Sequence, residues 1–93
     1  MVETKTVVRN KAGIHVRPSG VILEEAKDYS GRIEVEANGT ALELNNVMAL
    51  LSLGLVQGSE VTIRVEGPNE EQEAEKMAEL FSRHFDFPPR KGG

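Results

Sequence analysis

Hydrophobic and polar residues alternate along four short stretches of the chain, a pattern typical of strands that bury one face. Asn38-Gly39 separates the second stretch from the third, and this dipeptide is the strongest short-range signal for a β-hairpin. We therefore predict four strands, of which the middle two form a hairpin. They cover residues 2–9, 32–37, 40–44 and 61–65.

Three further segments place apolar residues at helical spacing. The first helix begins at Val16, and Pro18 is tolerated in its first turn because the missing N–H would have no intrahelical partner there. Ser30-Gly31 is expected to end this helix. Its apolar stripe consists of Ser19, Ile22, Leu23 and Ala26.

The other two helices differ in length. Asn45 or Asn46 caps a short helix that runs to about Leu53. A long helix opens near Asn69, which together with Gln72 has the spacing of a capping box. The buried stripe of the long helix consists of Ala74, Met77, Ala78, Phe81 and Phe85.

The predicted element order is β-α-β-β-α-β-α. Strands that alternate apolar and polar residues need cover on one face only, so all the helices are expected on the same side of the sheet. The fold class is therefore α+β: an open-faced β-sandwich with a four-stranded antiparallel sheet and three helices on one face. A length of 93 residues supports one domain, predicted over residues 1–87, with a C-terminal tail at 88–93 that has no periodicity.

Composition removes several classes of function. The chain has no cysteine, which excludes disulfides and thiolate chemistry, and its two histidines are too few for a structural zinc site. A net charge of −4 argues against binding to nucleic acid. No stretch has the ~20 consecutive apolar residues of a membrane span, and the N-terminus lacks a secretory pattern. We expect a cytoplasmic protein without membrane insertion, metal or cofactor.

Charge is unevenly distributed along the chain. Residues 70–86 hold six acidic residues against two basic ones, which accounts for the whole net charge of −4. Between Glu3 and Glu24 there is no acidic residue, and His15 lies within this locally positive stretch. The other histidine, His84, is predicted in the last turn of the long helix, where a cation is favourable. The basic residues of the positive stretch are Lys5, Arg9, Lys11 and Arg17.

His15 stands at the start of the first helix, directly after a segment in which Gly13 permits a tight turn. The first-turn backbone N–H groups of a helix, here those of Val16 and Arg17, form a ready anion site. The Arg17 guanidinium adds a fork of donors suited to phosphate oxygens. A neutral imidazole is a nucleophile, and a phosphoryl group on it would be stabilised by these donors. A loop histidine beside a solvated arginine has the same local sequence, so the residues alone leave both interpretations open.

The short helix carries apolar residues on two faces. A short helix over an open-faced sheet buries one side, so a second apolar face points to solvent or to a partner, with Met48 suited to an adaptable contact. The alternative is that loops cover this side and the whole helix is core. One face consists of Asn46, Ala49, Leu50 and Leu53, and the opposite face of Val47, Met48 and Leu51.

Two separated motifs resemble the HPr family, the histidine-containing phosphocarriers of the phosphoenolpyruvate-dependent phosphotransferase system. They are Gly13-Ile14-His15-Val16-Arg17-Pro18 and Asn46-Val47-Met48-Ala49-Leu50-Leu51-Ser52-Leu53-Gly54, the latter followed by Gln57-Gly58-Ser59-Glu60-Val61. The resemblance extends over about residues 4–85, and the predicted element order is that of the family.

The resemblance implies a phosphoryl relay. His15 would accept a phosphoryl group at Nδ1 from phosphorylated enzyme I and pass it to a histidine on an A-type domain of enzyme II, while Arg17 stabilises the group. The resemblance also implies a monomer that docks both partners through one surface. That surface would consist of Gly20, Val47, Met48 and Leu51.

Three positions depart from the common family pattern. The regulatory serine position is occupied by Asn46, which has no hydroxyl to phosphorylate. Ala12 replaces the polar residue often found before the glycine, and Val16 replaces the small or hydroxylated residue common after the histidine. The Asn45-Asn46 pair and residues 67–71 are similar to the nitrogen-related paralogue of HPr. Sugar-branch and nitrogen-branch or regulatory roles therefore both stay open, as does a structural subunit in which His15 is incidental.

Overall fold

The structure is a computed structural model that describes residues 1–85. Its element order is the predicted β-α-β-β-α-β-α. The predicted tail at 88–93 and the last two residues of the predicted domain lie outside the described residues. The elements are β1 (Val2–Val7), α1 (Val16–Ala26), β2 (Arg32–Ala37), β3 (Thr40–Glu43), α2 (Val47–Leu51), β4 (Glu60–Glu66) and α3 (Glu70–Ser82).

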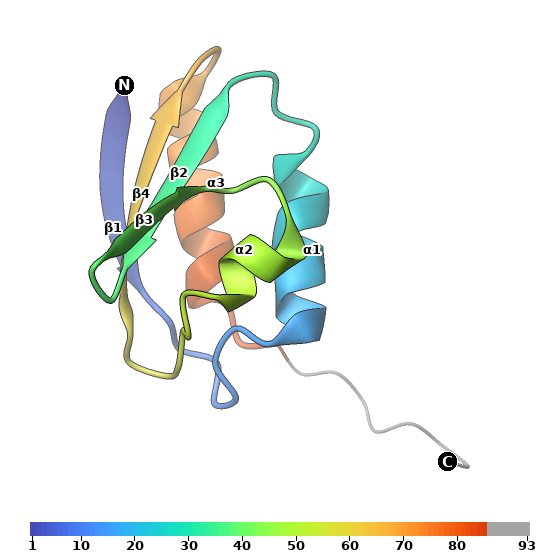
Figure 1. The fold of residues 1–93 in the computed structure, drawn as a ribbon. Helices are drawn as coiled ribbons and strands as arrows, with labels where there is room; N and C mark the ends of the chain where they lie inside the picture. The colour runs from blue at the N-terminus through green and yellow to red at the C-terminus, as the bar shows by residue number, and fades with distance from the viewer. Residues whose placement is uncertain (86–93) are drawn as a thin grey trace.

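The four strands form one antiparallel sheet in the order β1-β4-β2-β3 (Figure 1). Thr4, Ile63 and Val35 are register partners across three neighbouring strands, so their side chains share the same face. The hairpin between β2 and β3 turns at Asn38 and Gly39, whose φ angles of 52° and 80° are those of the tight turn that the dipeptide predicts.

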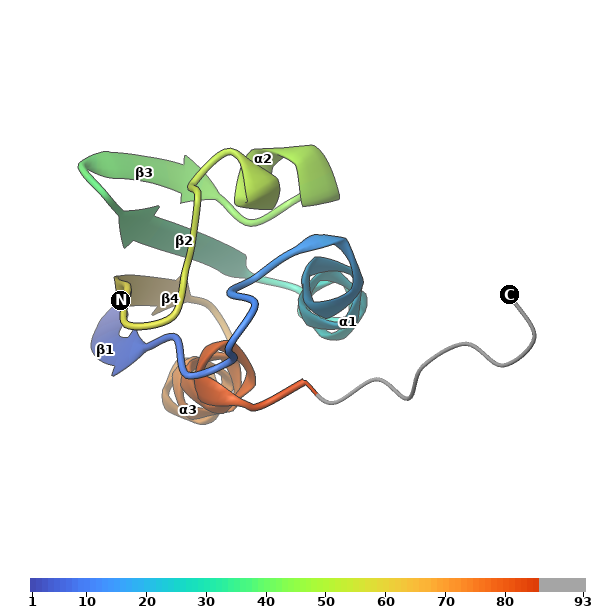
Figure 2. The same cartoon turned by 90° about the horizontal axis from the view of Figure 1, so that it is seen from below.

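All three helices cover the same face of the sheet, as Figure 2 shows from below. The core between the two layers is apolar, and the alternation in the strands is the reason, because every second residue of β2 and β4 is buried. The prediction of an open-faced α+β sandwich is confirmed. Its largest fully buried apolar side chains include Phe81, Met77 and Ile22 from the helices and Val35, Ile63 and Val65 from the strands.

The uncovered face of the sheet is polar and centres on Arg64. Its guanidinium forms ion pairs with Glu3 at 2.9 Å, with Glu34 at 2.9 Å and with Glu36 at 2.7 Å. Hydrogen bonds to these three carboxylates raise the pKa of Arg64. This network joins β1, β4 and β2 on the side of the sheet opposite the helices.

The prediction that α1 continues to Ser30-Gly31 is wrong, because the helix ends at Ala26. The Lys27 N–H still donates to the Leu23 carbonyl at 2.9 Å, but the Tyr29 N–H donates to the Ala26 carbonyl at 3.1 Å. The chain thus tightens into a three-residue turn that brings the partly buried Tyr29 against the core.

The short helix α2 ends at Leu51, two residues before the predicted end. Beyond Leu51 the backbone hydrogen bonds join residues three positions apart instead of four. The Leu53 N–H donates to the Leu50 carbonyl and the Gly54 N–H to the Leu51 carbonyl, both at 3.1 Å. Leu53 is nevertheless buried, so the predicted inner face of this segment is correct at Leu50 and Leu53.

The predicted capping box of α3 does not form. Asn69 adopts a left-handed conformation with φ 49° and its side chain caps nothing. The carboxylate of Glu70 instead accepts a hydrogen bond from the Gly67 N–H at 3.1 Å. The helix ends at Ser82, so His84 lies beyond the last turn in which it was predicted.

Candidate functional site

His15 is the N-cap residue of α1, as the sequence predicts. Its backbone is extended, with φ −96° and ψ −163°, and its carbonyl accepts the first intrahelical hydrogen bond from the Ser19 N–H at 2.9 Å. The imidazole is half-buried. His15 is therefore fixed at its carbonyl by the helix while its ring remains accessible.

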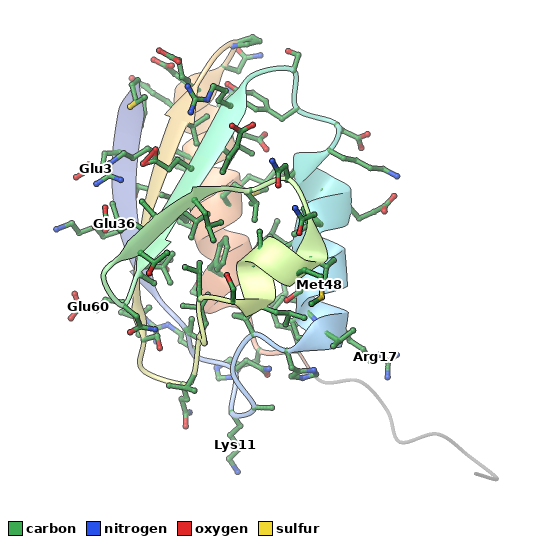
Figure 3. The ribbon with its side chains drawn as sticks, viewed as in Figure 1. Glu3, Lys11, Arg17, Glu36, Met48 and Glu60 are labelled. Carbon is green, nitrogen blue, oxygen red and sulfur yellow. The ribbon has the colours of Figure 1, made fainter. Side chains whose placement is uncertain are left out.

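The helix start supplies backbone donors directly after His15 in the chain. Helix geometry gives the N–H groups of Val16 and Arg17 no carbonyl four residues back within α1, and Pro18 has no N–H. No acidic residue lies in the first turn. Arg17 is exposed, and its side chain extends outward from the beginning of α1 (Figure 3). An anion bound on the His15 ring would meet the positive end of a helix and a guanidinium.

Gly13 determines the backbone conformation of the turn just before His15. Its φ of 74° favours glycine, and a Cβ at this position would collide with the Leu55 carbonyl and lie 2.9 Å from the Val56 Cα. The Ile14 N–H donates to the same Leu55 carbonyl at 3.1 Å. The loop that follows α2 therefore supports the segment before His15, although the two are about forty positions apart in the sequence.

Exposed apolar side chains are found on α1, on α2 and on the loop after α2. Val16 is 64% exposed, Met48 is 75% exposed and Val56 is largely exposed as well. The prediction that Val47 and Leu51 are also substantially exposed is wrong, because both are half-buried where α2 packs against α1 and β3. Figure 3 places Met48 on the same side of the molecule as Arg17. Sequence analysis missed Val56, whose signal is an apolar residue just before the polar Gln57-Gly58 turn.

Gly20 lies on α1 beside a shallow hollow of about 310 Å³. A Cβ at Gly20 would meet no heavy atom within 4 Å, so no described residue packs closely over this position. The hollow separates α1 from the start of α2, and it is lined by Gly20, Leu23, Glu24, Lys27, Asn45, Asn46 and Val47. Gly20 is itself half-buried, and its place on a docking surface stays a prediction.

Asn46, which the resemblance places at a regulatory serine position, has a structural role here. It is the N-cap of α2, and its Oδ1 accepts a hydrogen bond from the Ala49 N–H at 2.7 Å. Its Nδ2 donates to the Oδ1 of Asn45 at 2.9 Å. Of the two caps that the sequence allowed, Asn46 is therefore the one that forms.

The basic residues of the acid-free stretch do not form one patch. Lys5 faces the uncovered side of the sheet in a hollow that also contains Glu36. Lys11 lies at the same end of the molecule as the start of α1, where Arg17 lies (Figure 3). His84 shares a hollow of about 320 Å³ with Lys11, so the second histidine is closer to this end than sequence analysis indicated.

Within residues 1–85, no cluster of three or more metal-ligating side chains has the placement to hold a metal ion. No helix in the same range has the length and apolar character needed to cross a membrane.

Comparison with known proteins identifies the family. The profile described as "PTS HPr component phosphorylation site" matches residues 2–83. The chain is 34% identical over 81 residues to the phosphocarrier protein HPr of Borreliella burgdorferi, covering 87% of this chain and 94% of that protein. It is 33% identical over 78 residues to the HPr-like protein Crh of Bacillus subtilis, covering 84% and 92%.

Solved structures agree with the sequence match. The crystal structure of the phosphocarrier protein HPr from Bacillus anthracis superimposes with a TM-score of 0.82 at 28% identity, covering 87% of this chain and 96% of that one. A crystal structure of an HPr dimer from Thermoanaerobacter tengcongensis gives a TM-score of 0.60 at 35% identity, covering 84% and 88%.

Proposed function

The chain belongs to the HPr family of phosphocarrier proteins of the phosphotransferase system, and from that membership we propose that His15 is its phosphoryl acceptor. In this proposal, phosphorylated enzyme I donates the group to Nδ1 of His15, and a histidine on an A-type domain of enzyme II receives it. The observation that carries the proposal is the placement of His15 as N-cap of α1, beside the first-turn N–H groups and Arg17.

The transfer is a substitution at phosphorus. The lone pair of Nδ1 attacks the phosphorus of the donor's phosphoryl group, a nitrogen–phosphorus bond forms, and the bond to the donor breaks with its electron pair leaving on the donor. The phosphorylated ring carries negative charge that the Val16 and Arg17 N–H groups and the Arg17 guanidinium stabilise. The same donors serve both directions of the relay, because they contact the moving group rather than either partner.

The exposed apolar residues support a docking role for the surface around His15. Met48 and Val16 present apolar area that a globular partner would cover, and Gly20 leaves room for close approach. Val47 and Leu51 complete the proposed surface as half-buried side chains at its border. Because this surface adjoins the start of α1, a partner that covers it brings its own reactive group towards His15.

A regulatory role is the second candidate, and one comparison favours it. The relative that is 33% identical is an HPr-like protein, Crh, and a solved Crh structure is described as a catabolite repression protein. In such a role the phosphorylation state of His15, in a sugar or nitrogen branch, would be the output. Asn46 has no hydroxyl, so phosphorylation of a serine at that position is not part of the proposed regulation.

We place this activity in the cytoplasm, where enzyme I and phosphoenolpyruvate are found, and propose that the chain acts as a monomer. A monomer leaves the surface around His15 open to both partners in turn. A similar HPr has been solved as a dimer, so sedimentation of the full chain tests this part of the proposal separately.

The experiment incubates the full chain with enzyme I and labelled phosphoenolpyruvate. The expected product carries label that is labile in acid and stable in base, as for a phosphohistidine. His15→Ala is expected to fold normally and to accept no label, because a half-buried surface side chain contributes little to the core. His84→Ala is the matched control and should be labelled like the wild type. Label that persists in His15→Ala would overturn the assignment, and loss of label in His84→Ala would move the site to His84.

A further inference from the structure

The buried polar residues of the described chain flank the candidate acceptor. Among residues 1–85, only Asn10 and Ser19 are polar and buried, and they lie five positions before and four positions after His15. Asn10 is 5% exposed. Burial of an amide side chain is unfavourable unless it is hydrogen-bonded, so a buried asparagine indicates a specific set of partners.

Asn10 makes three hydrogen bonds that join two distant parts of the chain. Its backbone carbonyl accepts from the Gly13 N–H at 2.9 Å, and its Nδ2 donates to the Gly13 carbonyl at 2.8 Å. Its Oδ1 accepts from the Phe85 N–H at 2.9 Å, which lies 75 positions later. One side chain therefore closes the turn before His15 and fastens it to the segment after α3.

These bonds fix the peptide unit between Gly13 and Ile14 from two sides. Asn10 binds its carbonyl, while the Leu55 carbonyl accepts its N–H at 3.1 Å. The Ile14 side chain is buried in the core. His15 follows directly, and its own carbonyl is held by the Ser19 N–H. The backbone on each side of His15 thus has a fixed position.

We propose that Asn10 is a positioning residue for the phosphoryl transfer, acting on His15 through the Gly13–Ile14 peptide. This inference rests on the proposed function of His15. A nucleophile must lie close to the phosphorus and in line with the leaving group, and small displacements lower the rate strongly. Asn10 does not contact the reacting atoms, so it acts on the orientation of the acceptor and not on docking.

Four variants of the full chain separate the bonds. Asn10→Ala removes both side-chain bonds, and Asn10→Asp keeps the acceptor for the Phe85 N–H but loses the donor to Gly13. Phe85→Pro removes the Phe85 N–H, and Phe85→Ala controls for loss of the ring while keeping that N–H. Val2→Ala is the stability control, because Val2 is a partly buried core residue at the opposite end of β1 from the His15 segment.

Phosphorylation kinetics with enzyme I provide the first readout. Asn10→Ala and Asn10→Asp are expected to lower kcat by about 10- to 100-fold with KM unchanged. Phe85→Pro should have a smaller effect than either, yet a larger one than Phe85→Ala. Val2→Ala should keep the wild-type kcat. A wild-type kcat in Asn10→Ala, or a loss no greater than in Val2→Ala, would overturn the proposal.

Amide hydrogen exchange provides a second readout that does not depend on phosphorylation. Asn10→Ala should exchange the Gly13 and Ile14 amides about 10-fold faster or more, while the amides of Val35 and Ile63 keep their protection. Unchanged exchange at Ile14 would show that Asn10 does not hold this peptide, which refutes the inference. If the wild-type chain accepts no phosphoryl group, the proposed function fails, and the exchange result then tests only whether Asn10 holds the Gly13–Ile14 peptide.

Discussion

Met48 and Leu50 lie two positions apart on α2 and have opposite environments. Met48 is 75% exposed, whereas Leu50 is 1% exposed and belongs to the core. The helix has only five residues, which is about one and a half turns, and residues two positions apart point to different sides of it. One short helix therefore contributes Leu50 to the core and Met48 to the surface on the same side of the molecule as Arg17.

This contrast predicts a separation of folding from binding. Leu50→Ala should lower the free energy of unfolding by about 2–5 kcal/mol, because it leaves a cavity in the core. Met48→Ala should change it by less than about 0.5 kcal/mol and weaken binding to enzyme I. Met48→Glu should bind more weakly still, since it places an unpaired charge in a desolvated contact.

The two measurements are a denaturant melt and a titration with enzyme I for each variant. If Met48→Ala unfolds as readily as Leu50→Ala, the Met48 face is core and the docking surface lies elsewhere. Val56→Ala adds a test of the residue that sequence analysis missed, and weaker binding with an unchanged melt would place Val56 on the same surface.

Arg17 is expected to act on the transfer step. Arg17→Ala should lower kcat by roughly 10²-fold in both directions with KM nearly unchanged, because its charge stabilises the moving group. Arg17→Lys should rescue the rate only in part, since an ammonium lacks the planar fork of donors. Single-turnover kinetics with enzyme I and with an A-type domain measure both directions. A raised KM with a normal rate at saturation would make Arg17 a docking residue instead.

The sequence predicted those parts of the fold that depend on local patterns. Alternation along β2 and β4 marks the buried face, and Asn38-Gly39 marks the hairpin because its two residues must adopt positive φ. The start of α1 near Val16 was also predictable, since Pro18 is tolerated in a helix only near its first turn.

The features that sequence analysis missed depend on contacts between distant residues. Asn10 looks like a polar loop residue in the sequence, and only the fold brings it to Phe85 and buries it. Val47 is half-buried on a short helix that contacts both α1 and β3, and a helical wheel contains neither contact. At the start of α3, the Glu70 carboxylate accepts a hydrogen bond from the Gly67 N–H before the helix, which the Asn69–Gln72 spacing did not predict.

Ser19 is expected to be a destabilising residue. Its hydroxyl is buried in the first turns of α1 and has no hydrogen-bond partner among the described residues. Ser19→Ala removes an unsatisfied buried group and should raise the free energy of unfolding by about 1 kcal/mol, with phosphoryl acceptance unchanged. Ser52→Ala is the control, because the exposed Ser52 hydroxyl donates to the Ala49 carbonyl at 2.6 Å and its loss offers no such gain. Equal melts for wild type and Ser19→Ala would contradict this prediction.

Glu73 and Glu79, both on α3, are expected to change stability with pH in opposite directions. Burial raises the pKa of Glu73 above its ordinary value of 4.5, so folding disfavours its charged form, and Glu73→Gln should stabilise the protein at pH 7. That gain shrinks as the pH falls through the raised pKa and towards the ordinary one, because the carboxyl becomes protonated in both states.

The hydrogen bond from Arg83 lowers the pKa of Glu79 in the folded protein. The charged carboxylate therefore stabilises the fold at pH values above its ordinary pKa, and this stability is lost as the pH falls through the lowered pKa. Glu79→Gln should therefore destabilise the protein at pH 7, and the loss should fade in acid. Denaturant melts of both variants and the wild type between pH 7 and pH 3 measure the two trends. Effects of the same sign at pH 7 would show that burial does not dominate at Glu73.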